Sequence, residues 1–329
     1  MKELGSIVRR LAVDPAGGAV LATLVTARGS SYRRPGARLL LTAAGERLGS
    51  ISGGCLEEDV LARARSVAAT GAAELVVYDT TTENDLMWGV GLGCHGVVQV
   101  LIEKLPSQPQ WAMTLADNLG ARRPTLLDVV WRAKGPQALG TWLTDSTPPE
   151  AGTFRQEVRP PASLLVFGAG DDARPLVRAA SELGWCVTVA DPRAAFAKPE
   201  RFPEADRVIC ASAHTLVEQV KPESGSLAVV MTHHYVHDMP ILQALLPWPL
   251  AYVGLLGPKK RAERILEDLR GGGSVVSDEQ LARLHAPVGL DLGAETPEEV
   301  ALAILSEMQA ILSGRNARPL RERVKPIHG

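Results

Sequence analysis

The segment LLVFGAGDDARPLV (164–177) decides the fold of the second half of the chain. Its apolar beginning is typical of a buried parallel strand, and GAG (168–170) then allows a tight turn into residues with helical spacing. Asp191 ends the next apolar run about 20 residues after this turn, as the dinucleotide fingerprint requires. A strand, a glycine turn, a helix and an acidic residue in this order predict a Rossmann-like unit.

Further apolar runs alternate with helical segments through the rest of this half, as in a doubly wound parallel sheet. The last helix should begin at a capping box, with Thr296 as the N-cap and Glu299 three residues later. We therefore expect the α/β fold class, with a Rossmann-like, doubly wound parallel-sheet domain over 161–314 and a flexible basic tail over 315–329. The predicted strands are CVTVA (186–190), DRVICA (206–211), LAVVMT (227–232) and LAYVGLL (250–256).

The first half of the chain lacks this alternation, which predicts an α+β domain over 1–160. The proline-containing segment RPPAS (159–163) is typical of a domain boundary. Helices are expected over 2–12, 55–70 and 108–120, and strands over 19–27, 37–42, 46–52, 73–79, 96–105, 125–132, 138–143 and 153–158.

Composition excludes several classes of protein. The net charge of −2 gives no electrostatic basis for binding nucleic acid or an anionic membrane. The apolar stretches are far shorter than the roughly 20 residues of a membrane span, and the charged N-terminus does not resemble a signal peptide, so we expect a cytoplasmic protein. The four cysteines include no CxxC pair, which argues against a disulfide framework or a structural zinc site. Cys186 and Cys210 fall within predicted strands, where core positions are expected.

The segment SISGGCLEEDV (50–60) is the first candidate binding motif. Gly53 and Gly54 permit backbone conformations closed to other residues, and Cys55 then falls at a predicted helix N-terminus, where the helix dipole favours a thiolate. Glu57 and the two acids after it oppose that thiolate. A reactive cysteine and an inert buried one are therefore both compatible with this segment.

The segment GLGCHG (91–96) is a second glycine-rich turn, with Cys94 and His95 just before a predicted strand. If this turn and the one at Cys55 line a common cleft, their side chains would suit a soft metal or a sulfur-rich ligand.

The segment ARGSSYRRPGARL (27–39) concentrates arginines in one predicted loop. Arg28, Arg33, Arg34 and Arg38 are candidate anion ligands, because guanidinium groups bind carboxylate and phosphate with paired hydrogen bonds. Ordinary surface arginines are the alternative.

The predicted Rossmann turn carries a nucleotide-binding hypothesis for Gly168, Gly170, Asp191 and Arg193. The two aspartates that follow the turn (171–172) would repel a phosphate. A Rossmann scaffold with an altered or empty nucleotide site is thus the alternative.

A group of histidines, His233, His234 and His237, follows the predicted strand 227–232 together with Asp238. These side chains lie where open α/β sheets bind ligands, so a metal site is one hypothesis. A helix-capping Asp238 with solvated histidines is the other.

Taken together, these segments resemble the xanthine dehydrogenase accessory protein family (XdhC/CoxI type). The similarity extends over nearly the whole chain and includes SISGGCLEEDV, GLGCHG, LLVFGAG, ADPR, VVMTHHYVHDMPIL and GLLGPKKR. The chain departs from the common family pattern at Asp171, where histidine is usual, at His95, where glycine is usual, and at Pro258, where serine is usual.

The resemblance implies a cytoplasmic, non-catalytic maturation factor that binds molybdenum cofactor in its molybdopterin form as cargo. It implies support of cofactor sulfuration and insertion into a xanthine dehydrogenase, aldehyde oxidoreductase or carbon monoxide dehydrogenase. The implied partners are that apo-enzyme, a cysteine desulfurase, the cofactor biosynthesis enzymes and a second copy of the chain. It also implies that Cys55 and Cys94 lie nearest the molybdenum, and that Gly53, Gly54, Glu57 and His95 contact the cofactor beside them. The arginines Arg33, Arg34 and Arg38 would hold the cofactor's phosphate or appended nucleotide.

Two other functions are compatible with the motifs. One is an NAD(P)-dependent oxidoreductase that uses the Rossmann domain, with His233 or His234 as its acid or base. The other is a sulfur transferase that carries a persulfide on Cys55.

Overall fold

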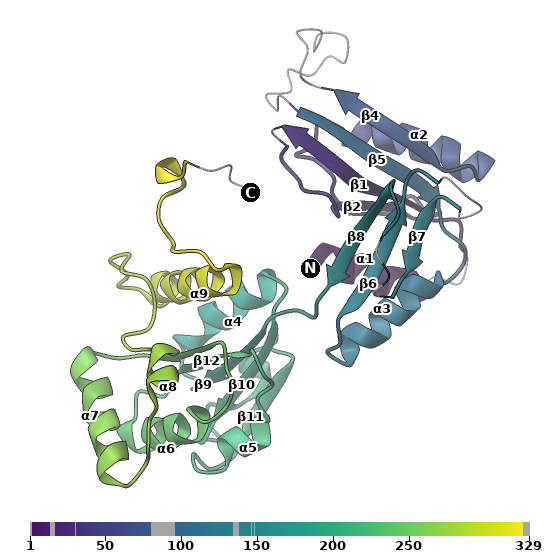
Figure 1. The fold of residues 1–329 in the computed structure, drawn as a ribbon. Coiled ribbons are helices and arrows are strands. Elements are labelled where there is room, and N and C mark those ends of the chain that lie inside the picture. The colour runs from purple at the N-terminus through teal and green to yellow at the C-terminus, as the bar shows by residue number, and fades with distance from the viewer. Residues whose placement is uncertain are drawn as a thin grey trace. The chain divides into compact units, whose positions relative to one another are not determined.

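The computed structural model describes residues 2–13, 17–29, 31–79, 96–133, 138–145, 147 and 149–324. Contacts within the chain divide it into two units, Met1–Pro160 and Pro161–Gly329, each with its own core (Figure 1). Each unit is described by itself below.

Unit 1 is built on a five-stranded antiparallel sheet with the order β3-β2-β1-β5-β4. Alternate residues of β1 enter two different cores, because successive side chains of a strand point to opposite faces. Helix α2 (Glu57–Thr70) covers one face, and α1 (Lys2–Val13) and α3 (Gln110–Gly120) pack on the other. The strands are β1 (Val20–Gly29), β2 (Arg38–Leu41), β3 (Arg47–Gly49), β4 (Glu74–Asp79) and β5 (Gly96–Lys104).

A second, smaller antiparallel sheet completes unit 1, with the order β7-β6-β8. Its strands are β6 (Thr125–Val130), β7 (Gly140–Leu143) and β8 (Thr153–Val158). Leu127 and Val158 of this sheet join the core that lies under α1 and α3.

Unit 2 has a six-stranded parallel sheet with the order β11-β10-β9-β12-β13-β14, which confirms the predicted α/β class. β14 has only two residues, too few to give a sequence pattern, and was not predicted. The strands are β9 (Ser163–Phe167), β10 (Cys186–Asp191), β11 (Arg207–Cys210), β12 (Leu227–Val230), β13 (Tyr252–Leu255) and β14 (Leu284–His285).

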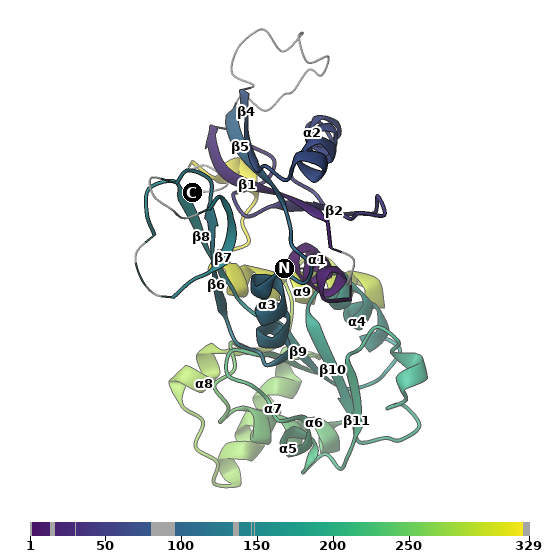
Figure 2. The same ribbon diagram turned by 90° about the vertical axis from the view of Figure 1, so that its right-hand side faces the viewer.

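Helices cover both faces of this sheet (Figure 2). Helices α4 (Ala173–Glu182) and α9 (Pro297–Ser313) share one core, and α5 (Leu216–Val220), α6 (Tyr235–Leu245) and α7 (Lys259–Gly271) share the other. The short elements are η2 (Pro199–Arg201), α8 (Asp278–Ala282) and η3 (Leu320–Glu322).

The predicted start of α9 is confirmed, since the Thr296 side chain accepts from the Glu299 N–H and the Glu299 carboxylate from the Thr296 N–H. The prediction that Cys186 and Cys210 occupy core positions is wrong. Cys210 is exposed at the last residue of the edge strand β11, and Cys186 is half-buried at the first residue of β10. No helix within the described ranges is long and apolar enough to cross a membrane.

Candidate functional site

The segment between β3 and α2, here called the GGC loop (50–56), is organised around Glu57. The Glu57 carboxylate accepts hydrogen bonds from the Ser50 hydroxyl at 2.9 Å, from the Ser52 N–H at 2.8 Å and from the Ser52 hydroxyl. The Ser52 hydroxyl oxygen in turn accepts hydrogen bonds from the N–H groups of Gly54 at 3.1 Å and Leu56 at 3.2 Å. One carboxylate therefore fixes the path of the loop, and Glu57, a predicted ligand-contacting residue, is bonded within it.

The Glu57 carboxylate is kept ionised by these bonds. Burial alone would raise its pKa, but the hydrogen bonds from Ser52 and Ser50 outweigh burial, and the net pKa is lowered.

Cys55 is half-buried and packs at the edge of the α2 core. The first turn of α2 begins two residues later, at Glu57, with Leu56 as the N-cap. Cys55 thus precedes the helix instead of standing on its first turn, where the sequence pattern places it. The residue is therefore neither fully buried nor fully exposed.

The loop 31–37, here called the arginine loop, meets the GGC loop at Tyr32. The Tyr32 ring lies 3.7 Å from the point that a Cβ on Gly53 would occupy, and Tyr32 is 68% exposed. The neighbouring Arg33 bonds Glu3, with 3.0 Å between Nη1 and Oε1. The pKa of Arg33 is raised chiefly by that hydrogen bond, burial opposes the shift, and the charges of Glu3 and Glu57 add to it. The structure therefore brings together two motifs that are separate in the sequence.

The other predicted arginines lie differently. Arg28, near the end of β1, and Arg34 are exposed. Arg38 is buried, because its position on β2 faces the same side as its cross-strand partner Thr23, opposite to α2. The prediction that it lies on the arginine loop is thus wrong.

The Arg38 guanidinium is only partly satisfied. Its Nη1 donates to the Gly36 carbonyl at 3.0 Å and to the Gln156 side chain at 2.6 Å, whereas Nε and Nη2 have no partner among the residues that the structure describes. Burial lowers the pKa of Arg38 to about 10, and the nearby Glu103 opposes this shift.

Cys94 and His95 lie in 80–95, outside the described residues. The described backbone resumes at Gly96, whose partner in the β1–β5 ladder is Gly29. Gly29 ends β1 just before the arginine loop.

In unit 2, the glycine turn after β9 lies at the carboxyl edge of the sheet, between β10 and β12. A Cβ on Gly168 would lie 2.4 Å from the Met231 carbonyl oxygen, so close packing of two backbones requires glycine there. A Cβ on Gly170 would lie 2.5 Å from a carboxylate oxygen of Asp172, so this carboxylate lies directly on the turn.

Asp191 is fully buried, and both of its oxygens are occupied by the chain itself. It accepts from the Ala169 N–H at 2.7 Å and from Arg193, through the N–H at 2.8 Å, Nε at 2.8 Å and Nη2 at 2.7 Å. Burial would raise its pKa, but these bonds outweigh burial and lower it. Asp191 therefore ties the glycine turn to β10, and Arg193 stacks over Phe196 at 4.2 Å.

The two aspartates after the turn also have partners in the chain. Asp171 pairs with Arg201 at 2.8 Å, and Asp172 bonds the His233 ring at 2.6 Å. His233 has a φ of +62°, an uncommon conformation for a non-glycine residue, at the carboxyl end of β12. A Rossmann-type dinucleotide therefore does not fit these residues as they stand, because a carboxylate lies where its pyrophosphate would bind.

One sequence hypothesis made Asp238 the cap of its helix, and this is wrong, because the N-cap of α6 is His234. Asp238 is fully buried in the first turn of α6, accepts from the Thr232 hydroxyl at 2.6 Å and pairs with Arg261. Within the part of the chain that the structure describes, no three histidine, cysteine or acidic side chains are grouped to hold a metal ion.

Sequence reasoning missed Tyr32 and the serines that bind Glu57. Tyr32 stands within the quoted arginine motif, but no pattern indicates that it contacts Gly53, because that contact depends on how two loops distant in sequence fold together.

Comparisons with known proteins agree over both units. Residues 13–79 match the model of the XdhC and CoxI family, and residues 164–308 match the XdhC Rossmann domain. A protein of Bacillus subtilis (strain 168) that is named as one probable subunit of xanthine dehydrogenase is 32% identical over 312 residues, or 88% of this chain and 92% of that protein. The molybdenum cofactor insertion chaperone PaoD of Escherichia coli (strain K12) is 26% identical over 89% of this chain and 83% of its own length.

A crystal structure of a xanthine dehydrogenase from Bacillus halodurans has the same fold, with a TM-score of 0.82 and 30% identity. The match covers 98% of this chain and 99% of that one. With this likeness over the whole length, the chain belongs to the XdhC and CoxI family, the xanthine dehydrogenase accessory proteins.

Proposed function

We propose that the chain is a maturation factor that binds molybdenum cofactor as cargo and supports its insertion into an enzyme of the xanthine dehydrogenase or aldehyde oxidoreductase class. The relatives' names support this role, since one is a molybdenum cofactor insertion chaperone and another is named for xanthine dehydrogenase itself. The observation that carries it is the meeting of the arginine loop and the GGC loop beside a half-buried cysteine.

The chemistry of this surface suits the cargo. Cys55 supplies a soft sulfur ligand for molybdenum or for its sulfur substituent. The exposed ring of Tyr32 offers a flat face to a pterin, and the exposed Arg34 offers a charge to its phosphate. Glu57 does not contact the cargo in this proposal; it positions the loop that presents Cys55.

The finer parts of the proposal follow the family resemblance. Cys94 and His95 would complete the molybdenum-facing surface, and a cysteine desulfurase would supply sulfur while the cofactor is bound. The cofactor biosynthesis enzymes would deliver the molybdopterin form, and the exchange would take place in the cytoplasm between the apo-enzyme and this protein.

Copurification tests the proposal. The protein is expressed in cells that make molybdenum cofactor, and the molybdenum retained per chain is compared for the wild type, Cys55→Ala and Cys210→Ala. Cys210 is an exposed cysteine at the edge of the other unit, so its loss should leave retention unchanged. Cys55→Ala should lose most of the bound molybdenum, and equal retention in all three proteins would contradict the proposal.

Sulfur transfer through a persulfide on Cys55 is the second candidate function, favoured by the partial exposure of this residue. Intact-mass measurement after incubation with a cysteine desulfurase and cysteine separates the two. A mass increase of one sulfur atom, absent from Cys55→Ala, would show a sulfur carrier, whereas cofactor retention without it would show a binding protein.

A further inference from the structure

Arg38, the first residue of β2, directly follows the arginine loop and has its guanidinium group in the core of unit 1. It is 2% exposed and belongs to the face of the five-stranded sheet opposite to α2. Burial of a guanidinium group is costly unless its hydrogen-bond donors have partners. An arginine at this position therefore requires an explanation beyond core packing.

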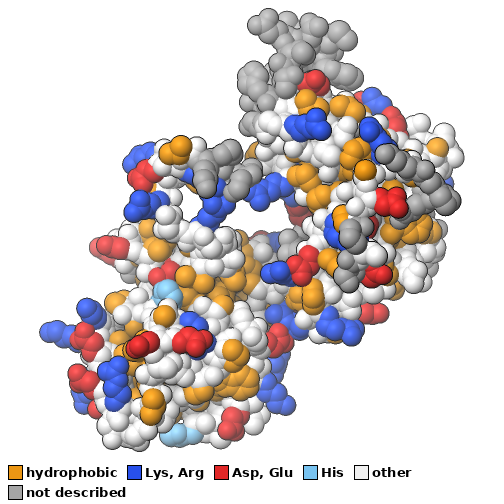
Figure 3. Space-filling model, in the orientation of Figure 1, with side chains coloured by type: hydrophobic (Ala, Val, Ile, Leu, Met, Phe, Trp, Pro, Cys, Tyr) orange, Lys and Arg blue, Asp and Glu red, His pale blue; other side chains and the backbone are white. Residues whose placement is uncertain are grey.

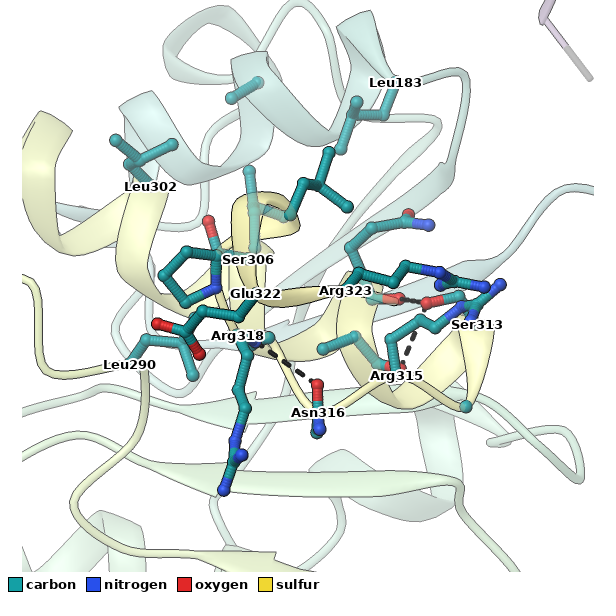
Figure 4. Close-up of a pocket in the computed structure, with 18 of the residues that line it drawn as sticks. Leu183, Leu290, Leu302, Ser306, Ser313, Arg315, Asn316, Arg318, Glu322 and Arg323 are labelled. Carbon is teal, nitrogen blue, oxygen red and sulfur yellow. Dashed lines mark hydrogen bonds between the residues drawn. The ribbon is translucent and has the colours of Figure 1, made fainter. Parts of the chain in front are cut away.

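Several other arginines of the chain avoid this cost. Arg155 holds both carboxylate oxygens of Asp128 with its Nε and Nη2 atoms, at 2.7 and 2.6 Å. Arg315 and Arg318 are exposed and line an open cavity between α9 and the segment that follows it (Figure 4). Figure 3 shows basic side chains at the surface around this segment. In Arg38 the edge formed by Nε and Nη2 is both buried and without a partner among the described residues.

The bonds that Arg38 does make are directed at the arginine loop. Its Nη1 donates to the carbonyl of Gly36, two residues earlier, and to the side-chain oxygen of Gln156 on β8. A Cβ on Gly36 would lie 3.0 Å from the amide nitrogen of Gln156, so a side chain there would press on the residue that Arg38 binds. Gly36, Arg38 and Gln156 thus form one joint between the arginine loop and the second sheet of unit 1.

This joint fixes a turn that begins at Arg34. The Ala37 N–H bonds the Arg34 carbonyl at 3.1 Å and closes the turn. The Gly36 N–H bonds the Leu24 carbonyl of β1 at 2.8 Å, and the Gly36 carbonyl accepts from Arg38. Gly36 is therefore held through both of its backbone polar groups, and the exposed Arg34 stands on the turn that they hold.

A second buried charge lies in the same core and holds a different strand. Glu103 on β5 is 7% exposed, and its charge favours the ionised form of Arg38. The Glu103 carboxylate accepts from Thr141 of β7, through the hydroxyl at 2.6 Å and the N–H at 3.0 Å. Arg38 and Glu103 thus bond opposite edge strands of the second sheet, β8 and β7, and of the two it is Arg38 that bonds the arginine loop.

We propose that Arg38 is a positioning residue, which fixes the arginine loop so that Arg34 is presented to an anion and which does not itself bind one. A buried arginine with an unpartnered edge is a poor choice for packing alone, and such local rules are broken at functional sites. The link to the phosphate of the cargo rests on the proposed function above, whereas the effect on the loop does not.

Hydrogen exchange measured by mass spectrometry tests the effect on the loop in the full chain. Arg38→Met should speed exchange in the peptide that covers 31–37 by about tenfold or more, because the Gly36 carbonyl and Gln156 lose their donor. Arg38→Lys keeps a charged donor and should restore part of the protection. The matched control Thr141→Val removes a buried hydrogen bond from the same core at β7, and it should leave exchange of the loop unchanged.

Copurified molybdenum tests the consequence for the cargo. Arg38→Met should retain less molybdenum per chain than Thr141→Val, with both variants folded by circular dichroism. Equal loop exchange in the wild type and Arg38→Met would overturn the proposal, as would equal acceleration in Arg38→Met and Thr141→Val. A faster-exchanging loop that still retains molybdenum at the wild-type level would overturn it as well. A wild type that retains no molybdenum would reject the proposed function, while the exchange rates would still support or overturn the role of Arg38 in the loop.

Discussion

Glu57 is the residue on which the geometry of the GGC loop most depends, because its carboxylate joins Ser50 and Ser52 to the start of α2. Glu57→Gln replaces one acceptor oxygen with a donor and leaves a part-buried N–H or hydroxyl without a partner. We expect it to lower the free energy of unfolding by about 1–3 kcal/mol and to reduce cofactor retention. Urea unfolding measures the first effect, and Glu58→Gln, at an exposed neighbour, should leave stability nearly unchanged.

The pH dependence of this effect has a definite sign. Since folding lowers the pKa of Glu57, its contribution to stability is present above the unfolded pKa of about 4.3 and is lost as pH falls through the folded value. The stability difference between wild type and Glu57→Gln should therefore shrink in acid. A difference that grows as pH falls would contradict this explanation.

His233 shows the opposite behaviour. Its hydrogen bond with Asp172 raises its pKa above the ordinary value of about 6.5, so its contribution is complete below that pH and is lost as pH rises through the folded pKa. An NMR titration of the ring should show this pKa fall in Asp172→Asn. The control Asp171→Asn removes a carboxylate that pairs with Arg201 and not with His233, so it should leave the pKa of His233 unchanged.

The sequence predicted the structural role of a residue well where local spacing determines that role. It predicted the role poorly where contacts between distant segments determine it. The capping box at Thr296 follows from four consecutive residues and is confirmed. Arg38 and Arg34 carry the same side chain in the same motif, yet one is buried and the other exposed, since only the sheet register decides which face Arg38 takes. Asp191 was correctly placed at a strand end, but its bond with Arg193 was not visible in the sequence.

At the scale of elements, substitutions at two glycines with positive φ distinguish the cost of backbone strain from the cost of a steric clash. A Cβ on Gly168, where φ is +130°, would lie 2.4 Å from a backbone oxygen. A Cβ on Gly45, where φ is +83° in the β2–β3 turn, would meet no described atom within 4 Å beyond its chain neighbours. Gly45→Ala should cost about 1 kcal/mol through backbone strain alone. Gly168→Ala should cost several times more, because β9 and the residues after β12 must move apart; chemical denaturation measures both, and equal costs would contradict the close-packing explanation.

Strand and helix order could be predicted because apolar runs and glycine breaks recur along the chain. The parallel strands at 164–168 and 227–232 have long apolar runs and were located within two residues at each end. Pairing partners could not be predicted: β6, β7 and β8 form a sheet of their own, because strand pairing depends on contacts between residues distant in sequence.

At the scale of the whole molecule, the two units carry different tasks in the proposed function. Unit 1 brings Tyr32, Gly53 and Cys55 together, and this surface carries the proposed cargo site. In unit 2, the Rossmann edge is occupied by the chain's own contacts, between His233 and Asp172 and between Arg193 and Asp191. Equilibrium binding should therefore detect no tight association of NAD or NADP with the wild type, and micromolar binding of either would contradict this assignment.

Alkylation of Cys55 in the presence and absence of molybdenum cofactor tests the proposed cargo site most directly. Iodoacetamide labelling is followed by peptide mass spectrometry, with Cys210 in the same chain as the internal control. We expect bound cofactor to slow labelling of Cys55 at least tenfold and to leave labelling of Cys210 unchanged. Equal labelling of Cys55 with and without a stoichiometric amount of bound cofactor would contradict a cargo site at this cysteine.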